Sequence, residues 1–314
     1  MNHMPDNILS TLEHDPSKGK GTILFGGSGF LGPYILENYP EIISVGRNPC
    51  PNKNRHIHVD SLDDLSALDD VEFDRVIYII GHTDHYLMEK EDVGRDEPSA
   101  FDYHTVPMFR VMEQIKHRDI KKFIHFSSVL IYDENRITLP VSERSPIDPY
   151  KNRYVMSKYL GEELCKFYRN WMPVINCRMC NLYGPTPLER YDLIHRLAGK
   201  LLDDGKAEIW SDKPSRDFIY AEDAAHAIVD LLYSDCNDTV ILGSGEMTTV
   251  RHVIDVMSEV SGCPITSLDK PVSGPMAFRA DLTTLQKAID WEPRISIEEG
   301  ILRSFEFEKR RRGL

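Results

Sequence analysis

The sequence has few of the features that mark membrane, nucleic-acid-binding or disulfide-rich proteins. No apolar run approaches the roughly 20 residues that a membrane-spanning helix needs. The formal net charge of −13 repels phosphate backbones and anionic lipid surfaces. The short basic end EKRRRGL does not reverse that balance. We therefore expect no nucleic-acid partner and no membrane partner.

Cysteine is also sparse, with six residues spread over a chain of 314. This scatter favours reduced thiols over a disulfide framework. Cys177 and Cys180 have CxxC spacing, but they stand alone in PVINCRMCNLYG, a segment typical of a buried strand. We expect core thiols and no metal site. The first 21 residues lack the cationic start and apolar centre of a signal peptide, so we expect a cytoplasmic protein.

The first half of the chain alternates short β-prone runs with segments of helical periodicity. Such alternation predicts an α/β fold: a Rossmann-like, doubly wound parallel sheet with crossover helices on both faces. The hydrophobic content of 41% is enough for a sizeable core. The predicted strands are 21–27, 41–47, 55–60, 74–81, 121–128 and 173–181.

The regular alternation ends near residue 183, and Gly and Pro breaks become frequent after it. We interpret residues 1–20 as a polar N-terminal tail and residues 21–183 as an NAD(P)-binding Rossmann domain. Residues 217–243 are expected to return to that domain. A smaller C-terminal substrate-binding lobe is expected from residues 184–216 and 244–314.

A glycine-rich segment, GGSGFLG, directly follows the first predicted strand. Gly26, Gly29 and Gly32 are spaced three apart, which suits a tight turn, a close approach of backbone to pyrophosphate and close packing of helix on strand. A strand-to-helix turn without a ligand is the alternative. Its place in an alternating chain favours a dinucleotide, with Gly26, Gly29, Phe30, Leu31 and Gly32 as binding residues.

The second predicted strand ends in Gly46-Arg47-Asn48, without the carboxylate that commonly binds a ribose. Its absence removes a repulsion against a 2′-phosphate, and Arg47 could pair with that group. We therefore favour NADP slightly over NAD. The alternative is an exposed arginine, with NAD held by other contacts. Asp60 is a candidate contact to adenine, although an ordinary strand-end turn would use the same residue.

A candidate acid–base pair lies on a predicted helix over residues 149–168. Tyr154 and Lys158 are four residues apart and share a face, so an ammonium beside the phenol would favour phenolate. Upstream, the strand KKFIHFSS ends in Ser127-Ser128, whose hydroxyls could meet a substrate oxygen. An exposed Tyr–Lys pair without a function is the alternative reading of YxxxK.

In this order the motifs resemble the extended short-chain dehydrogenase/reductase family of NAD(P)-dependent nucleotide-sugar epimerases, dehydratases and reductases. The resemblance spans residues 21–303 and includes GGSGFLG, SSVLIY, YVMSK, CNLYGP, SRDFIYAEDAAHAI, ILGSGEMTTVRHVI and ADLTTLQKAIDWEP. It implies a catalytic set of Ser128, Tyr154 and Lys158, with the last two also contacting the cofactor. It implies substrate contacts by Ser128, Asn181, Arg216 and Arg279.

Departures from the family pattern narrow the reaction. Val129 and Leu130 stand where the 4,6-dehydratases carry Asp-Glu, and Leu130 replaces the cysteine of the fucose-synthase type. Both chemistries are therefore disfavoured. His104 stands where the family usually has asparagine; it could alter the proton path or simply pack. Pro107 should kink the same helix.

The resemblance therefore implies hydride transfer at a carbon of a nucleotide-diphosphate sugar, with C4 as the expected position. An epimerase and a 4-keto-reductase use the same residues, so the sequence leaves both open. The alternatives are a dehydratase, or a non-catalytic NAD(P)-binding redox sensor or scaffold. The resemblance also implies a homodimer formed by helices near 99–117 and 151–170. Phe101, Val106, Phe109 and Met112 are candidate contacts, or equally core residues.

Overall fold

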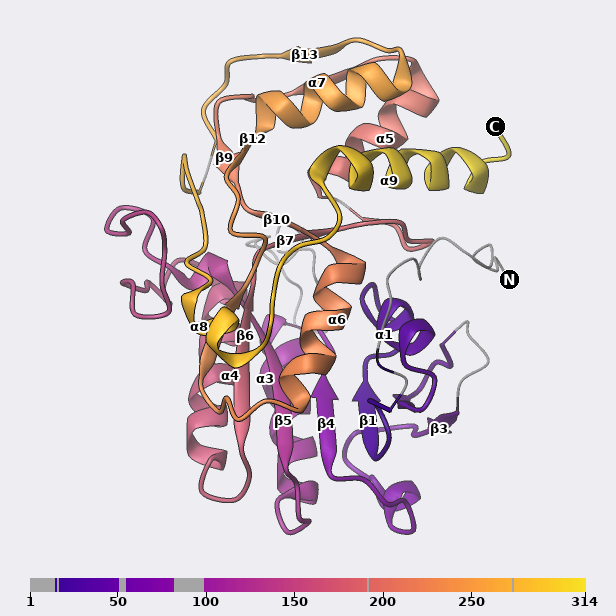
Figure 1. Cartoon of the computed structure of the whole chain (residues 1–314), viewed down its shortest axis with the longest axis vertical. Coiled ribbons are helices and arrows are strands. Elements are labelled where there is room, and N and C mark those ends of the chain that lie inside the picture. Colours follow the sequence, from indigo (N-terminus) through magenta and orange to yellow (C-terminus); the bar gives the residue numbers. More distant parts are fainter. Residues whose placement is uncertain (1–14, 16, 51–54, 82–98, 191, 273) are drawn as a thin grey trace.

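The computed structural model divides visibly into a sheet-containing lower part and a smaller helical upper part (Figure 1). The polypeptide ends near the upper part, where the C-terminal helix lies. The structure describes residues 15, 17–50, 55–81, 99–190, 192–272 and 274–314.

Seven parallel strands form the central sheet, in the order β11-β6-β5-β4-β1-β2-β3. Chain order reverses between β1 and β4, so the sheet is doubly wound and the predicted fold class is confirmed. All six predicted strands form, and each is shorter than its predicted range. The strands are β1 (Thr22–Phe25), β2 (Ile43–Gly46), β3 (His56–His58), β4 (Arg75–Tyr78), β5 (Lys122–Ser128), β6 (Val174–Met179) and β11 (Thr239–Leu242).

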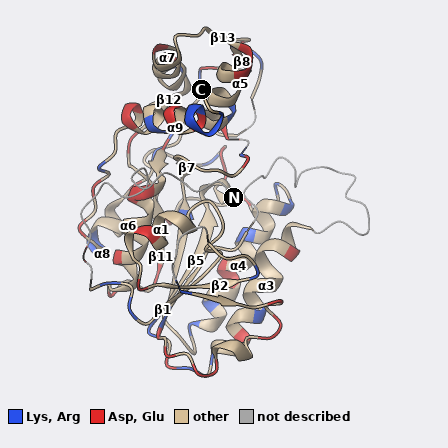
Figure 2. Cartoon of the chain, turned by 90° about the vertical axis from the view of Figure 1, so that its right-hand side faces the viewer, with Lys and Arg blue, Asp and Glu red and all other residues tan. Residues whose placement is uncertain are grey.

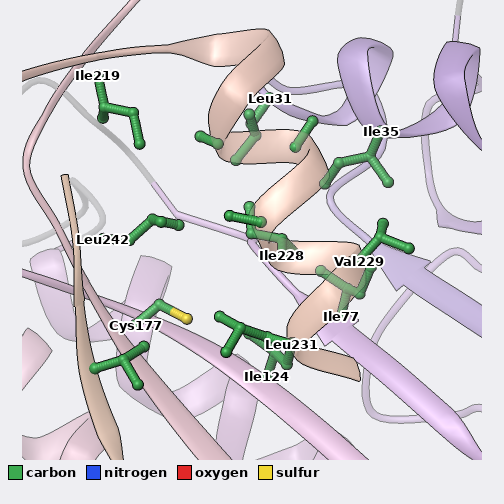
Figure 3. Packing of buried hydrophobic residues seen from close by; sticks show 14 of the residues in the cluster. Leu31, Ile35, Ile77, Ile124, Cys177, Ile219, Ile228, Val229, Leu231 and Leu242 are labelled. Atoms are coloured by element: carbon green, nitrogen blue, oxygen red, sulfur yellow. The ribbon is translucent and has the colours of Figure 1, made fainter. Parts of the chain in front are cut away.

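Helices cover both faces of the sheet because successive strand residues point to opposite sides. Ile23 of β1 packs in the core beneath α3 (Ala100–Ile115) and α4 (Arg153–Tyr168). Its neighbour Leu24 packs beneath α1 (Gly32–Asn38) and α6 (Ala221–Leu232). Figure 3 shows this second core, in which α6 packs its apolar side onto α1 and the sheet; its labelled residues are Leu31, Ile35, Ile77, Ile124, Cys177, Ile219, Ile228, Val229, Leu231 and Leu242.

The upper part has its own hydrophobic core, which includes Leu197, Ile254 and Phe305. These residues come from three helices: α5 (Leu193–Asp204), α7 (Val250–Ser261) and α9 (Ile297–Arg311). A short parallel pair, β8 (Ala207–Ile209) and β13 (Ile265–Ser267), lies beside them.

Short elements connect the two parts of the molecule. Parallel strands β7 (Asn181–Tyr183) and β10 (Phe218–Tyr220) pair between them, as do antiparallel β9 (Ser215–Arg216) and β12 (Thr248–Thr249). Figure 1 shows both pairs between the sheet and the upper helices. The remaining elements are α8 (Thr283–Ala288) and the 3-10 turns η1 (Ser66–Leu68) and η2 (Val129–Ile131).

Charged side chains of both signs cover the C-terminal helix α9 (Figure 2). Arg311 and Arg312, from the basic end of the sequence, both pair with Glu308 at distances of 2.6 and 2.8 Å. Arg312 also pairs with Asp203 of α5. The basic end is therefore partly neutralised within the molecule.

Most of the expected N-terminal tail lies outside the described residues. Its last residues pack against the protein: Lys18 Nζ lies 2.5 Å from Asp230 Oδ1 of α6, and the Gly19 amide donates to the Tyr233 hydroxyl at 2.7 Å. The segment before β1 is therefore attached to the helix layer. Across the described part of the chain, no helix is long and apolar enough to cross a membrane.

Candidate active site

The glycine-rich turn between β1 and α1 lies at the carboxyl end of β1, next to the point where the strand order of the sheet reverses. Gly26 has φ of +97°, and a Cβ there would lie 3.0 Å from the backbone nitrogen of Ile80. At Gly32 a Cβ would lie 2.2 Å from the carbonyl oxygen of Gly27. Any side chain at these positions would collide with backbone, so the turn needs glycine at both.

The middle of the turn is less crowded. A Cβ on Gly29 would meet only the Gly26 carbonyl oxygen, at 3.2 Å, which leaves its outer side open to a bound group. Phe30 and Leu31 are buried and anchor the turn in the core beneath α1. A bare backbone at the carboxyl end of β1, facing the start of a helix, fits a dinucleotide pyrophosphate.

The proposed catalytic residues lie together at the carboxyl edge of the sheet, on which the glycine turn also lies. They are Ser128, Tyr154 and Lys158. Ser128 is the last residue of β5, while Tyr154 and Lys158 lie in the first turns of α4, which the Asn152 side chain caps by accepting from the Val155 amide at 2.9 Å. The Tyr154 hydroxyl is hydrogen-bonded to the Ser128 side chain. Lys158 Nζ donates to the carbonyl oxygen of residue 126 at 3.0 Å.

Burial dominates the electrostatics of this cluster. Tyr154 and Lys158 are each only 8% exposed. Burial raises the pKa of Tyr154 above its usual value, and this outweighs the lowering effects of the Ser128 hydrogen bond and of the Arg190 charge. Burial also lowers the pKa of Lys158, to about 8.

The expected lowering of the tyrosine pKa by lysine is therefore not seen in the protein itself. Lys158 Nζ lies 5.9 Å from the centre of the Tyr154 ring and is directed to a backbone carbonyl. At that separation the desolvation of the phenolate is the larger effect. Both residues lie on α4, and burial is the main influence on the pKa of each.

Arg47 and Asp60 follow β2 and β3, the two strands next to β1 on one side of the sheet. Arg47 is exposed directly after β2, and its carbonyl oxygen is 3.1 Å from the His58 ring. The Asp60 side chain is 97% exposed and lies 2.9 Å from the other nitrogen of the same ring. Asp60 is thus already engaged with His58, whereas Arg47 lies at the carboxyl end of β2, as expected of a ribose-side residue.

Of the four predicted substrate residues, Ser128 ends β5, and the other three lie on the short strands and bridges between the two parts. Both the backbone amide and Nδ2 of Asn181 donate to the Asp217 carbonyl oxygen, at 3.0 and 3.1 Å. Arg216 follows Ser215, which bridges to residue 277, and the exposed Arg279 lies two residues further on. The fold therefore places Arg216 and Arg279 on neighbouring backbone segments, while Asn181 starts β7.

Arg190 is a site residue that the sequence analysis missed. Its guanidinium carbon lies 4.0 Å above the centre of the Phe30 ring, over the glycine turn, and its Nε donates to Asp192 at 2.6 Å. Asp192 in turn accepts from His195, and its interactions with His195 and Arg190 hold the pKa of the Asp192 carboxyl below its usual range despite burial. The sequence offers only an arginine and an aspartate two residues apart, a pattern too common to single out.

The fold and the glycine turn together define a dinucleotide-binding α/β enzyme. The chain belongs to the NAD-dependent epimerase/dehydratase family, whose model matches residues 22–243. It is 28% identical to a putative UDP-glucose 4-epimerase of Methanocaldococcus jannaschii, over 90% of this chain and 96% of that protein. It is 24% identical to GDP-mannose 3,5-epimerase 1 of Oryza sativa subsp. indica, over 93% of this chain and 82% of that protein.

Solved structures show the same fold. UDP-glucose 4-epimerase of Thermotoga maritima, solved with UDP-glucose, superimposes with a TM-score of 0.79 and 21% identity, covering 92% of this chain and 98% of that one. RMD from Pseudomonas aeruginosa, solved with NADPH, gives a TM-score of 0.76 and 20% identity, covering 93% and 100%. At these identities the likeness establishes the fold alone.

Proposed function

We propose that this protein is an NAD(P)-dependent nucleotide-sugar epimerase or 4-keto-reductase that transfers hydride at C4 of the sugar. The observation that carries the proposal is the meeting of Ser128, Tyr154 and Lys158 at the end of β5 and the start of α4, on the same carboxyl edge of the parallel sheet as the glycine turn. The relatives are named as epimerases acting on UDP-glucose and GDP-mannose, which supports a nucleotide-diphosphate sugar as substrate.

In this proposal each side chain has a separate task. Tyr154 takes the proton of the sugar hydroxyl in oxidation, or gives it back in reduction, and Ser128 donates a hydrogen bond to the same oxygen. Lys158 holds the ribose of the dinucleotide. The nicotinamide supplies or accepts the hydride. Asn181, Arg216 and Arg279 hold the nucleotide-diphosphate part of the substrate.

Glycine positions and exposed polar groups supply the proposed dinucleotide contacts. Gly26, Gly29 and Gly32 leave backbone bare for the pyrophosphate, with Phe30 and Leu31 fixing the turn. Arg47 favours NADP slightly over NAD, and Asp60 is the proposed contact at the adenine side. Solved relatives include complexes with NAD and with NADPH, so the family accommodates both forms.

Two alternative functions, a dehydratase and a non-catalytic NAD(P)-binding protein, have less support. Dehydration needs an additional acid and base, but Val129 and Leu130 stand in the 3-10 turn directly after Ser128. A non-catalytic NAD(P)-binding sensor or scaffold has no need for three polar side chains that meet in a buried site. We propose a cytoplasmic location for the enzyme, based on the composition of its sequence.

We also propose a homodimer formed through α3 and α4. These helices pack on each other, and their outer face exposes Val106 (37%), Phe109 (44%) and Phe167 (55%). Of the residues considered from sequence, Met112 is fully buried beneath the helices and belongs to the core, whereas Val106 and Phe109 face outward. Apolar side chains on the outer face of two adjacent helices suit a four-helix interface between two copies.

The test is turnover by native protein and Tyr154→Phe on UDP-, GDP-, CDP- and dTDP-linked sugars and their 4-keto-6-deoxy derivatives. Reduction is followed by NADPH absorbance and epimerisation by NMR. We expect Tyr154→Phe to lose about 10²–10⁴-fold in turnover, because the ring still packs but exchanges no proton.

Tyr159→Phe is the matched control, since Tyr159 lies one residue beyond Lys158 on the same helix. It should keep native turnover. Calorimetric affinity for NADPH should be unchanged in both variants. A native protein that converts none of these sugars, or a fully active Tyr154→Phe, would remove the assignment of catalysis to this set.

A further inference from the structure

Asp217 lies where the chain passes from the upper part of the molecule to the strands beside the central sheet. It is the single residue between β9 and β10, which Figure 1 shows between the two parts. Its neighbour Arg216 belongs to the proposed substrate site, whereas the Asp217 side chain is fully buried. Successive residues of an extended chain point to opposite sides, so the carboxylate is directed away from the arginine and into the protein.

Four hydrogen-bond donors surround the Asp217 carboxylate. Oδ1 accepts from the amide and the hydroxyl of Ser244, at 2.7 and 2.9 Å. Oδ2 accepts from the amides of Gly245 and Ala280, at 3.0 and 3.1 Å. A carboxylate offers about four acceptor positions, so the ionised group is fully satisfied here. Burial raises the pKa of Asp217, and the hydrogen bonds act against that effect.

The carboxylate stands in for a backbone acceptor. Residues 276–280 run parallel to β9 and form two backbone hydrogen bonds with Ser215, at 2.8 and 3.1 Å. Two residues further along such a ladder, the Ala280 amide would donate to the Asp217 carbonyl oxygen. That carbonyl oxygen instead accepts the backbone and side-chain amides of Asn181. The Ala280 amide therefore donates to the Asp217 side chain, and one residue pairs with two neighbouring segments.

This arrangement fixes the position of Arg279. Both chain neighbours of Arg279 are buried, so the extended segment turns its side chain outward, where it is exposed. Its backbone is held on one side through the amide that donates to Asp217, and its carbonyl oxygen accepts from the Val141 amide at 2.8 Å. Arg216 contacts the same segment, because its Nη1 donates to the Pro275 carbonyl oxygen. The spacing of the two arginines therefore depends on how this segment is attached.

We propose that Asp217 is a positioning residue for substrate binding, whose buried carboxylate sets the place of Arg279 relative to Arg216. The inference rests on the proposed function, in which the two arginines hold the diphosphate of a nucleotide sugar. Without the carboxylate, the segment 276–280 loses its last attachment to the chain beside β9, and Arg279 moves away from its partner. The substrate then loses one charge-assisted contact, while the catalytic residues on β5 and α4 stay in place.

The test measures binding of UDP, GDP, CDP and dTDP to native protein and to Asp217→Ala by isothermal titration calorimetry. We expect the variant to bind the preferred diphosphate about ten- to a hundredfold more weakly, which is the effect of losing one charge-assisted bond. NADPH affinity should be unchanged. Asp217→Asn keeps one acceptor oxygen and should lie between the two. In turnover, KM for the sugar nucleotide should rise by the same factor, with kcat within about threefold of native.

Asp223→Ala is the matched control. Asp223 is also a buried carboxylate, 1% exposed, and it accepts the backbone amides of Arg294 and Ile295 at 3.2 and 3.1 Å. None of these residues has a proposed substrate contact. Both substitutions remove a buried acceptor and should lower the free energy of unfolding, but only Asp217→Ala should weaken diphosphate binding. An equal loss of diphosphate affinity in the two variants would overturn the proposal.

A double-mutant cycle with Arg279→Ala tests whether Asp217 acts through the arginine. If it does, Asp217→Ala should change the diphosphate affinity by less than about twofold once Arg279 is already alanine. The full effect of Asp217→Ala in that background would overturn the proposal. The same cycle is run with Asp217→Asn, whose smaller change keeps the test available if Asp217→Ala does not fold.

The outcomes separate the two proposals. A native protein that binds none of the four diphosphates and converts no nucleotide sugar overturns the proposed function, and the positioning role with it. A native protein that binds one of them, and whose Asp217→Ala and Asp217→Asn variants bind it as tightly, overturns the positioning role alone.

Discussion

At the scale of single residues, the choice between NAD and NADP depends on Arg47. It follows Gly46, whose backbone has open space where a side chain would begin, and it is exposed to solvent at the carboxyl end of β2. Asp60, the nearest acid considered from sequence, is paired with His58. In the proposed site, the cationic side chain of Arg47 is therefore the group available to a 2′-phosphate.

We expect native protein to bind NADPH more tightly than NADH, and Arg47→Asp to reverse that order. A charge-assisted pair at a partly exposed site is worth about 1.5–3 kcal/mol, or roughly ten- to a hundredfold in affinity. Isothermal titration calorimetry with both nucleotides measures the ratio. Arg55→Asp makes the same change of net charge just before β3 and should leave the ratio unaltered. Equal affinities in the native protein would discard the NADP preference.

At the scale of elements, a buried ion pair fixes α4 against the sheet. Arg178 of β6 donates to both carboxylate oxygens of Glu162 on α4, at 2.9 and 2.7 Å. The same guanidinium donates to the Tyr132 hydroxyl at 3.0 Å and to the Glu143 carbonyl oxygen at 2.9 Å. Hydrogen bonds and charge from Arg178 hold the pKa of Glu162 below its usual value, although burial alone would raise it. Helix α4, which carries Tyr154, is thereby anchored.

We expect Arg178→Met to reduce the free energy of unfolding by about 3–5 kcal/mol, because it leaves the Glu162 carboxylate buried without its cation. The double variant Arg178→Met/Glu162→Leu should recover much of that loss, since neither charge is then buried. Urea unfolding followed by circular dichroism measures both. If the double variant were as unstable as the single one, loss of packing and not of charge pairing would be the cause.

At the scale of the whole molecule, the outer face of α3 and α4 is the surface we assign to self-association. The exposed apolar residues there, including Phe109 and Phe167, come from two helices that pack against each other. Scattered exposed hydrophobic residues are normal on a protein surface, but a set on adjacent helices favours an interface.

We expect native protein to be dimeric by light scattering at micromolar concentration, and Phe109→Glu to shift it to monomer, because the interface would have to bury a carboxylate. Met276→Glu is the control, since Met276 is 53% exposed but lies far along the chain from both helices. It should remain dimeric. A native monomer at these concentrations would contradict the proposed homodimer.

Sequence patterns predicted the strands well because their signal is local. In β1, alternation of residues between two helix layers makes every position apolar or β-prone, and the run of glycines marks where the strand stops. Helical periodicity was less decisive for α3. Phe109 and Met112 are three residues apart, and each suited either the core or an interface. The packing of α4 beside α3 places Met112 inside and Phe109 outside.

The sequence alone determined the fold class, the family and the chain positions of the glycine turn, Ser128, Tyr154 and Lys158, since each depends on short-range spacing. Only the tertiary structure decided what surrounds them. It brings Arg190 over Phe30 from about 160 residues away, and it turns His104 of α3 onto Tyr154. It also makes burial the main influence on the pKa of Tyr154. Burial and long-range contacts depend on how helices and strands pack, and no local pattern of residues records that.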